Sequence, residues 1–157
     1  MILQYLKFSI SITIISWVVG MIINTILSKK EFYINLSNLN FIKSKTLNKK
    51  IGLGIFKWIV KNTFFKFFNQ SLKLRKKIEI SDLYELRKQM TTAEMNHLIG
   101  FVFVTVFALV KIIKGYYLFG LIFMIVNAIL NLYPSLLQQE NKRRIEKLIK
   151  KYSQKQL

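Results

Sequence analysis

The chain has 157 residues, 52% of them hydrophobic, and a formal net charge of +18. It contains no cysteine and one histidine, His97, which excludes disulfide bonds, cysteine-ligated metal centres and any multi-histidine metal site within one chain. The basic residues flank long apolar blocks, so we expect an all-α integral membrane protein with no nucleic-acid partner.

The first apolar block, residues 8–27, has 20 residues and no charged side chain. As a helix it would be about 30 Å long, which matches the hydrocarbon core of a bilayer. A cleaved signal peptide is the alternative, but Lys7 is the only basic residue before the block and no small-residue cleavage site follows it. Lys29 and Lys30 come shortly after the block, so we expect a retained N-terminal span.

Two further apolar blocks lie close together in the C-terminal half. Residues 95–113 contain several polar or charged side chains, so alone they could equally form a buried helix. Residues 116–137 are uncharged, and only Lys114 and Gly115 separate the two blocks. Such a short connection is typical of a two-span helical hairpin, in which each helix satisfies its own backbone hydrogen bonds. Pro134 is expected to kink or end the second helix of this hairpin.

The distribution of lysine and arginine orients these spans. Residues 29–88 carry 15 of the 25 basic residues and residues 142–155 carry seven. Because basic segments stay in the cytoplasm, we expect the N-terminus and the hairpin turn outside the cell membrane. The segment 28–93 and the tail 138–157 would lie inside. We treat residues 1–157 as a single membrane domain.

The basic middle segment contains an aromatic, lysine-rich stretch that begins at Leu53. It consists of apolar side chains at helical spacing, further aromatic residues and lysines: Phe56, Val60, Phe64, Phe67, Trp58, Phe65, Phe68, Lys57, Lys61 and Lys66. This pattern predicts an amphipathic helix in the membrane interface, and the alternative is a helix packed on the rest of the protein. Residues 73–77 predict a solvated basic stretch near anionic headgroups. Ser81 is expected to cap a helix that leads into the second span.

Glu94 and His97 are three residues apart at the start of the second span and would share one face of a helix. A carboxylate can hold an imidazole in one tautomer, and the imidazole can then take a proton from an attacking hydroxyl. The pair could equally mark the helix end without any chemistry. Glu-x-x-His is also half of a di-iron motif, but the chain has no second copy. We therefore expect neither a metal nor a cofactor.

The third span carries polar residues on one face of its helix: Asn127, Asn131, Ser135 and Gln138. They could bind a substrate, or they could hold the helices together through hydrogen bonds. In the expected topology the second span starts, and the third span ends, at the same depth. These residues would then meet Glu94 and His97 in one cleft, with Asn141 and Arg144 just beyond. Basic residues there suit an anionic donor or headgroup.

Two sequence segments carry a resemblance to a known family. Residues 93–98 read Ala-Glu-Met-Asn-His-Leu, and residues 131–144 contain five residues at a matching spacing: Asn131, Pro134, Gln138, Asn141 and Arg144. Both segments resemble signatures of the glycosyl-4,4'-diaponeurosporenoate acyltransferase family, as does the order of the spans.

The chain departs from that family's pattern at two places. Gln139 and Glu140 stand where Arg-Tyr is usual, and Thr91-Thr92 stands where basic residues are frequent. Glu140 is therefore expected to pair with Arg143 or Arg144.

The resemblance implies transfer of a fatty acyl chain to a hydroxyl of a glycosylated carotenoid or another lipid-like acceptor. The donor would be acyl-CoA or acyl carrier protein. His97 would be the general base, Glu94 would orient it, and Asn131, Gln138 or Asn141 would hold the developing oxyanion. The alternatives are a non-catalytic scaffold or accessory subunit of a lipid or envelope enzyme and, ranked last, a component of an oligomeric transporter.

Overall fold

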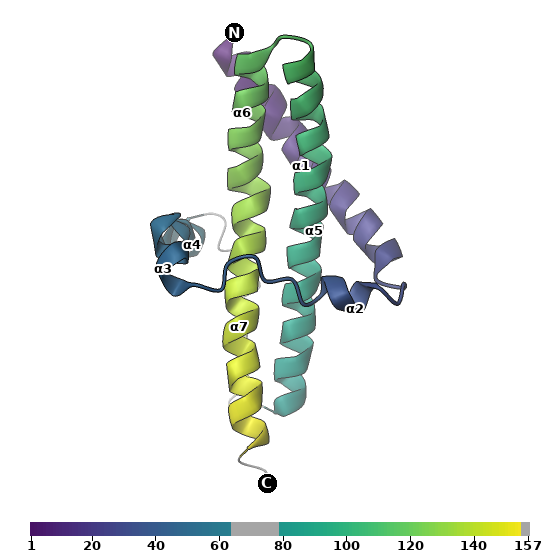
Figure 1. The fold of residues 1–157 in the computed structure, drawn as a ribbon, viewed down its shortest axis with the longest axis vertical. Coiled ribbons are helices and arrows are strands. Elements are labelled where there is room, and N and C mark those ends of the chain that lie inside the picture. The colour runs from purple at the N-terminus through teal and green to yellow at the C-terminus, as the bar shows by residue number, and fades with distance from the viewer. Residues whose placement is uncertain (64–78, 155–157) are drawn as a thin grey trace. The chain divides into compact units, whose positions relative to one another are not determined.

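The computed structural model describes residues 1–63 and 79–154, and every regular element in them is helical (Figure 1). The elements are α1 (Ile2–Leu27), α2 (Tyr33–Leu36), α3 (Lys45–Lys50), α4 (Leu53–Asn62), α5 (Ile80–Ile113), α6 (Tyr117–Asn127), the π-helical turn η2 (Ala128–Leu132) and α7 (Tyr133–Ser153). The prediction of an all-α fold is confirmed.

Three helices of the described chain are long and apolar enough to cross a membrane: Ile2–Leu27, Ile80–Ile113 and Tyr117–Ser153. The prediction of three spans is confirmed, and the chain is an integral membrane protein. Each helix is longer than the apolar block that predicted it, because polar and charged residues beside the block continue the same helix.

The start of α5 differs from its prediction. The helix begins at Ile80, so Ser81 lies inside the first turn and is not the N-cap. The carboxylate of Asp82 accepts a hydrogen bond from the backbone N–H of Glu79 at 3.0 Å. That bond satisfies a donor just before the helix, and the negative charge also suits the positive end of the helix dipole. The prediction for Ser81 was wrong because the neighbouring aspartate takes this role.

Pro134 does not end the third membrane helix, since α6, η2 and α7 follow one another without a break. Proline lacks an N–H donor, and its ring crowds the carbonyl four residues earlier, here that of Leu130. Leu130 lies in the π turn, where the helix is wider and the carbonyl is displaced. The helix therefore runs through Pro134, and most of the predicted basic tail is helical.

Helix α4 is shorter than the predicted amphipathic stretch. It ends at Asn62, because Thr63 has an extended backbone. Some of the predictions concern residues outside the described part of the chain: Phe64, Phe65, Lys66, Phe67, Phe68 and residues 73–77.

The contacts divide the chain into two compact units. The first unit comprises Met1–Leu39 and Thr92–Ser135, and the second unit comprises Asn40–Thr91 and Leu136–Leu157. Helices α5 and α7 contribute residues to both units.

In the first unit, α1 buries its polar and small residues and exposes its apolar ones. The buried residues recur every three or four positions: Ser9, Thr13, Ser16, Gly20 and Asn24. Ile14, Ile15 and Ile22 are exposed. A membrane provides an apolar surrounding for such isoleucines, and small side chains let helix backbones approach closely. This inverted polarity is what a lipid-facing helix requires.

The apolar core of the first unit lies near the hairpin turn. Val104, Ala108 and Phe123 are fully buried there. Tyr5 of α1 stacks on Phe119 of α6 with ring centroids 4.2 Å apart. The ammonium group of Lys111 lies 4.9 Å from the centroid of the Phe119 ring, so a cation–π contact accommodates this charge within the predicted second span.

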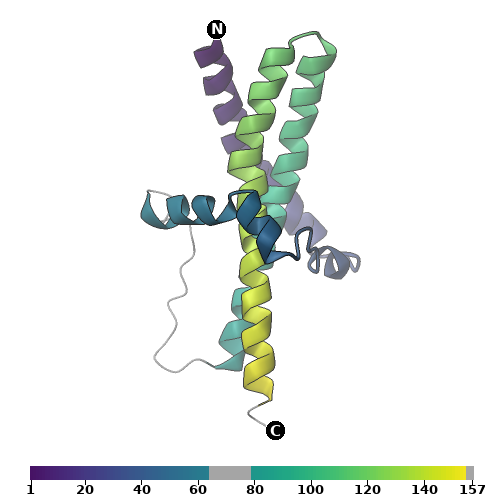
Figure 2. The ribbon, with the colours of Figure 1, turned by 60° about the vertical axis from the view of Figure 1, so that its left-hand side comes forward.

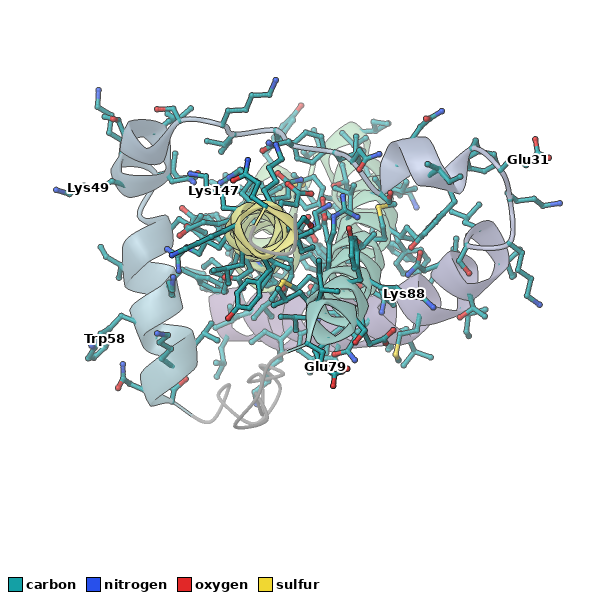
Figure 3. All side chains as sticks on the ribbon, turned by 90° about the horizontal axis from the view of Figure 1, so that it is seen from below. Glu31, Lys49, Trp58, Glu79, Lys88 and Lys147 are labelled. Atoms are coloured by element: carbon teal, nitrogen blue, oxygen red, sulfur yellow. The ribbon has the colours of Figure 1, made fainter. Side chains whose placement is uncertain are left out.

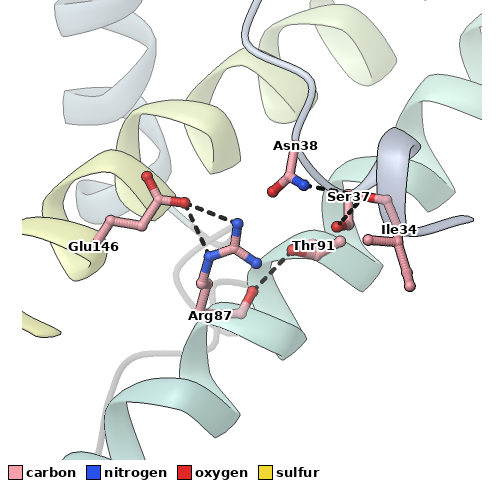
Figure 4. Close-up of polar contacts among 6 residues, drawn as sticks. All are labelled: Ile34, Ser37, Asn38, Arg87, Thr91 and Glu146. Atoms are coloured by element: carbon pink, nitrogen blue, oxygen red, sulfur yellow. Dashed lines mark hydrogen bonds and ion pairs between the residues drawn. The ribbon is translucent and has the colours of Figure 1, made fainter.

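The second unit packs by the rules of a soluble helix pair. The first turns of α5 and the last turns of α7 share a buried cluster of Leu83, Leu86, Ile145 and Ile149. Beside it, Nε and Nη2 of Arg87 both lie 2.9 Å from Oε1 of Glu146 (Figure 4). In the same figure, the Thr91 hydroxyl donates to the carbonyl of Arg87 at 3.0 Å. The second unit thus has an apolar seam with an ion pair along its edge.

Gly20 of α1 lies close to the backbone of α5, and it provides a test of this packing. An ideal Cβ atom on Gly20 would lie 2.3 Å from the backbone oxygen of Asn96. We expect Gly20→Ala to lower the free energy of unfolding by about 1–3 kcal/mol, because the helices must move apart. Circular dichroism during unfolding in sodium dodecyl sulfate would measure it. Gly54→Ala is the control, since among the described residues a Cβ there meets nothing within 4 Å beyond its own stretch of helix. Equal losses of stability in the two variants would contradict the close helix contact.

Candidate functional site

Five of the eight predicted site residues belong to the first unit: Glu94, His97, Asn127, Asn131 and Ser135. Gln138, Asn141 and Arg144 belong to the second unit. Direct contacts bring together His97, Asn127 and Asn131, so these three form the centre of the candidate site.

Asn131 lies fully buried in the π turn and is the hub of a hydrogen-bond network. Its Nδ2 group donates to Oγ of Ser16 at 3.1 Å and to Oδ1 of Asn127 at 2.9 Å. Its Oδ1 atom accepts from Nε1 of Trp17 at 3.1 Å and lies 3.4 Å from Nδ1 of His97. The network therefore joins α1, α5 and the third membrane helix, and it occupies both N–H donors of Asn131.

The two ends of this network fix the direction of every hydrogen bond in it. At one end, the indole N–H of Trp17 can only donate, so it must meet the oxygen of Asn131. At the other, Nδ2 of Asn127 donates to the backbone carbonyl of Phe101 at 2.9 Å, and a carbonyl can only accept. Oδ1 of Asn127 is thereby turned toward Asn131, whose nitrogen must donate to it. Both ends give the same orientation of the Asn131 amide.

The orientation of Asn131 determines the tautomer of His97. Because Oδ1 of Asn131 can only accept, the hydrogen bond to Nδ1 of His97 requires a proton on Nδ1. In a neutral imidazole, Nε2 then carries the free electron pair, which is the state that a general base needs. The sequence hypothesis gave the orienting role to Glu94, whereas the residue that meets Nδ1 is Asn131.

Trp17 and Gly100 complete the surroundings of the histidine. The Trp17 ring lies edge-on to the His97 ring, with centroids 6.1 Å apart and an interplanar angle of 84°. An ideal Cβ on Gly100 would lie 3.0 Å from Oγ of Ser16 and 3.1 Å from Oδ1 of Asn131. A glycine at position 100 therefore leaves the space that the polar network fills.

A second polar cluster lies one turn of α5 before the histidine. Nδ2 of Asn24 donates to Oδ1 of Asn96 at 2.7 Å and to the carbonyl of Thr92 at 3.2 Å. Tyr33 of α2 also interacts with Asn24. Burial raises the pKa of the Tyr33 hydroxyl, and the negative charge of Glu94 raises it further. The hydrogen bond with Asn24 lowers this pKa and so opposes the other two effects. The Tyr33 phenol therefore stays protonated at neutral pH.

Ser135 follows Asn131 by four residues on the third membrane helix and is fully buried. Its buried hydroxyl has no hydrogen-bond partner among the described residues. A buried polar group of this kind needs a partner, and a bound substrate would provide one.

The three predicted residues of the second unit have different surroundings. Gln138 and Asn141 are half-buried, and Arg144 is exposed. Arg144 forms an ion pair with Glu140, which confirms the expected pairing. Lys57 of α4 also approaches Glu140, at 3.7 Å. Arg143, the other expected partner of Glu140, donates to the side-chain oxygen of Asn40.

Sequence reasoning missed the contribution of α1 and α2 to the site: Ser16, Trp17, Asn24, Tyr33 and, from α5, Asn96. A signal was present, because Ser9, Thr13, Ser16, Gly20 and Asn24 recur at helical spacing in an otherwise apolar block. Within residues 1–63 and 79–154, no group of three or more histidine, cysteine or acidic side chains could hold a metal ion.

A comparison with protein families identifies the family of this chain. The family model of glycosyl-4,4'-diaponeurosporenoate acyltransferase covers residues 29–151 of the chain. The chain belongs to this acyltransferase family. No curated protein and no solved structure is significantly similar to it. The match includes the polar residues of α5, η2 and α7, and it begins after α1, which supplies Ser16 and Trp17.

Because His97 is the single histidine of this acyltransferase family member, its tautomer can be measured directly. We expect nitrogen NMR of the ¹⁵N-histidine-labelled protein in micelles to show a proton on Nδ1, held by Asn131. In Asn131→Leu, that acceptor is lost, so we expect the proton to shift toward Nε2 or to divide between the two nitrogens. Ser11→Ala, an exposed change on α1, is the control. A wild-type spectrum with the proton on Nε2 would contradict the assigned network.

Proposed function

We propose that this chain is a membrane-embedded O-acyltransferase that transfers a fatty acyl group to a hydroxyl of a glycosylated carotenoid or another lipid-like acceptor. The observation that carries the proposal is the hydrogen bond between Asn131 and Nδ1 of His97, which leaves Nε2 free to accept a proton. The membership in an acyltransferase family supports the reaction class. The location inside a membrane protein fits an acceptor that dissolves in lipid.

In the proposed reaction, Nε2 of His97 takes the proton of the acceptor hydroxyl as its oxygen attacks the acyl carbon of a thioester. The new C–O bond forms, the C–S bond of acyl-CoA or acyl carrier protein breaks, and His97 returns the proton to the leaving sulfur. Asn131 is a positioning residue, since it acts through His97. Both of its N–H donors already bond to Ser16 and Asn127, so we do not assign it to the oxyanion.

The hydroxyl of Ser135 is the better candidate for binding the developing oxyanion. It is buried, has no partner among the described residues, and follows Asn131 by four residues on the third membrane helix. A preorganised donor in a site without water is worth far more than one in solution. Gln138 and Asn141 stay predicted substrate-binding residues, and Glu94 stays a predicted partner of His97. Arg144 would attract an anionic donor, in competition with its ion pair to Glu140.

A non-catalytic scaffold is the second candidate function, and one observation favours it. The Asn131 network joins three helices through protein groups alone, which is how polar side chains hold a membrane bundle together. In that case His97 would contribute only packing, and its replacement by a residue of similar shape would have little effect.

Replacement of His97 separates the two functions. We expect His97→Gln to keep the fold, because glutamine can still donate to Asn131, but to reduce acyl transfer by about 10²–10⁴-fold or more, since general-base catalysis is lost. Mass spectrometry of lipids from cells supplied with a glycosylated carotenoid would measure the product, which is heavier by one acyl group. Ser11→Ala is the matched control. Equal product from His97→Gln and wild type, or none from either with any lipid acceptor, would favour the scaffold.

We also propose that the N-terminus and the hairpin turn lie outside the cell and that residues 28–93 lie in the cytoplasm, because the basic residues gather in that segment. Since the chain has no cysteine, single cysteines report on sidedness without a background. A membrane-impermeant maleimide should label Lys114→Cys on intact cells but reach Lys49→Cys only after the membrane is opened. The reverse pattern would invert the topology.

A further inference from the structure

Helix α4 has two apolar faces, and only one of them packs against the protein. Leu53 is buried, and Phe56 and Val60 beside it are half-buried. The other face carries Ile55 and Trp58, which are 69% and 65% exposed, and Ile59. These three residues are three and one positions apart, so they form one exposed strip on the helix. Figure 3 shows the labelled Trp58 side chain pointing away from α7.

A cluster of positive charge borders this exposed strip. The ammonium group of Lys57 lies 3.7 Å from Oε1 of Glu140, and Arg144 pairs with the same oxygen. Burial lowers the pKa of Lys57, the positive charges of Arg144 and Lys61 lower it further, and Glu140 opposes them. Lys57 and Arg144 thus meet at this carboxylate, and Lys61 lies near enough to Lys57 to repel its charge. Three cations and one carboxylate give these four side chains a net charge of +2. An additional anion at this place would be attracted.

The direction of α4 suits a membrane surface. Helix α4 runs crosswise to α7 (Figure 2), and α7 continues the third membrane helix, Tyr117–Ser153. A helix that runs crosswise to the axis of a membrane-spanning helix would lie along the plane of the membrane. Its ten residues, one exposed tryptophan and flanking lysines are typical of an interfacial helix.

We propose that α4 lies in the headgroup region of an anionic membrane leaflet and that Lys57, Lys61 and Arg144 form a binding site for lipid phosphate. Ile55, Trp58 and Ile59 would enter the boundary between headgroups and acyl chains. The occupant is an anionic phospholipid and not a protein surface, because the exposed strip is apolar whereas its border is strongly positive. Such a combination complements a lipid with a negative headgroup. The inference does not rest on the proposed acyl transfer.

The two tryptophans of the chain allow a direct test. The full-length protein would be reconstituted in vesicles that contain equal fractions of brominated phosphatidylglycerol or brominated phosphatidylcholine, since bromine quenches nearby indoles. The Trp58 signal is the difference between wild type and Trp58→Phe, which removes the contribution of Trp17. We expect the anionic brominated lipid to quench Trp58 at least about twofold more than the zwitterionic one, because cations enrich anionic lipid around α4.

Removal of the cluster supplies the decisive comparison. In the triple variant Lys57→Gln, Lys61→Gln, Arg144→Gln, we expect the two brominated lipids to quench Trp58 equally. A variant with Lys147→Gln, Lys150→Gln and Lys151→Gln loses the same charge from α7 and should keep the preference. The Trp17 signal checks that the first unit is intact. Equal quenching in the wild type, or no quenching of Trp58 by either lipid, would overturn the proposal, and the second result would indicate that a protein covers α4.

Discussion

Asn131 lies where three membrane helices meet, and its side-chain amide makes hydrogen bonds to residues of all three. In an apolar surrounding, an amide without partners is costly, so these bonds are made only when α1, α5 and the third helix are in register. Apolar surfaces alone do not determine which membrane helices associate, since lipid is equally apolar. The same amide that sets the register also sets the tautomer of His97. The helix arrangement and the chemistry of the histidine therefore have one physical cause.

The two units are stabilised by different forces. The first unit relies on small residues, polar side chains and close backbone contact, of which Gly20 is the clearest case. The second unit relies on leucine and isoleucine with an Arg87–Glu146 ion pair, as a soluble helix pair does. Because α5 and α7 contribute residues to both units, the kind of side chain through which each of these helices packs changes along its length. That change follows the sequence, in which apolar blocks give way to mixed apolar and charged segments.

The length of the apolar blocks was enough to predict three spans, because bilayer thickness sets the length of a membrane helix. The periodicity of Asn127 and Asn131 predicted a shared polar face, which is confirmed by their direct contact. The pairing of Asn131 with His97 depended on the register of two helices, which no local pattern encodes. The role of Trp17 was missed because an indole in an apolar block looks like any other large side chain. The exposed face of α4 also differs from expectation, since Phe56 of the predicted stripe is half-buried and Trp58 is exposed.

The π turn Ala128–Leu132 has a consequence for how this helix tolerates changes in length. A π turn is in effect one residue more than an α-helix needs, so deletion of one residue there would let the backbone close into regular α-helix. The deletion would, however, rotate the rest of the helix about its axis. Each residue of an α-helix turns by about 100°, so every side chain beyond the deletion would face a different direction. Ile145 and Ile149 would leave their buried seam while Asn127 kept its place. The extra residue is thus an angular offset that determines which side chains of α7 enter the buried seam.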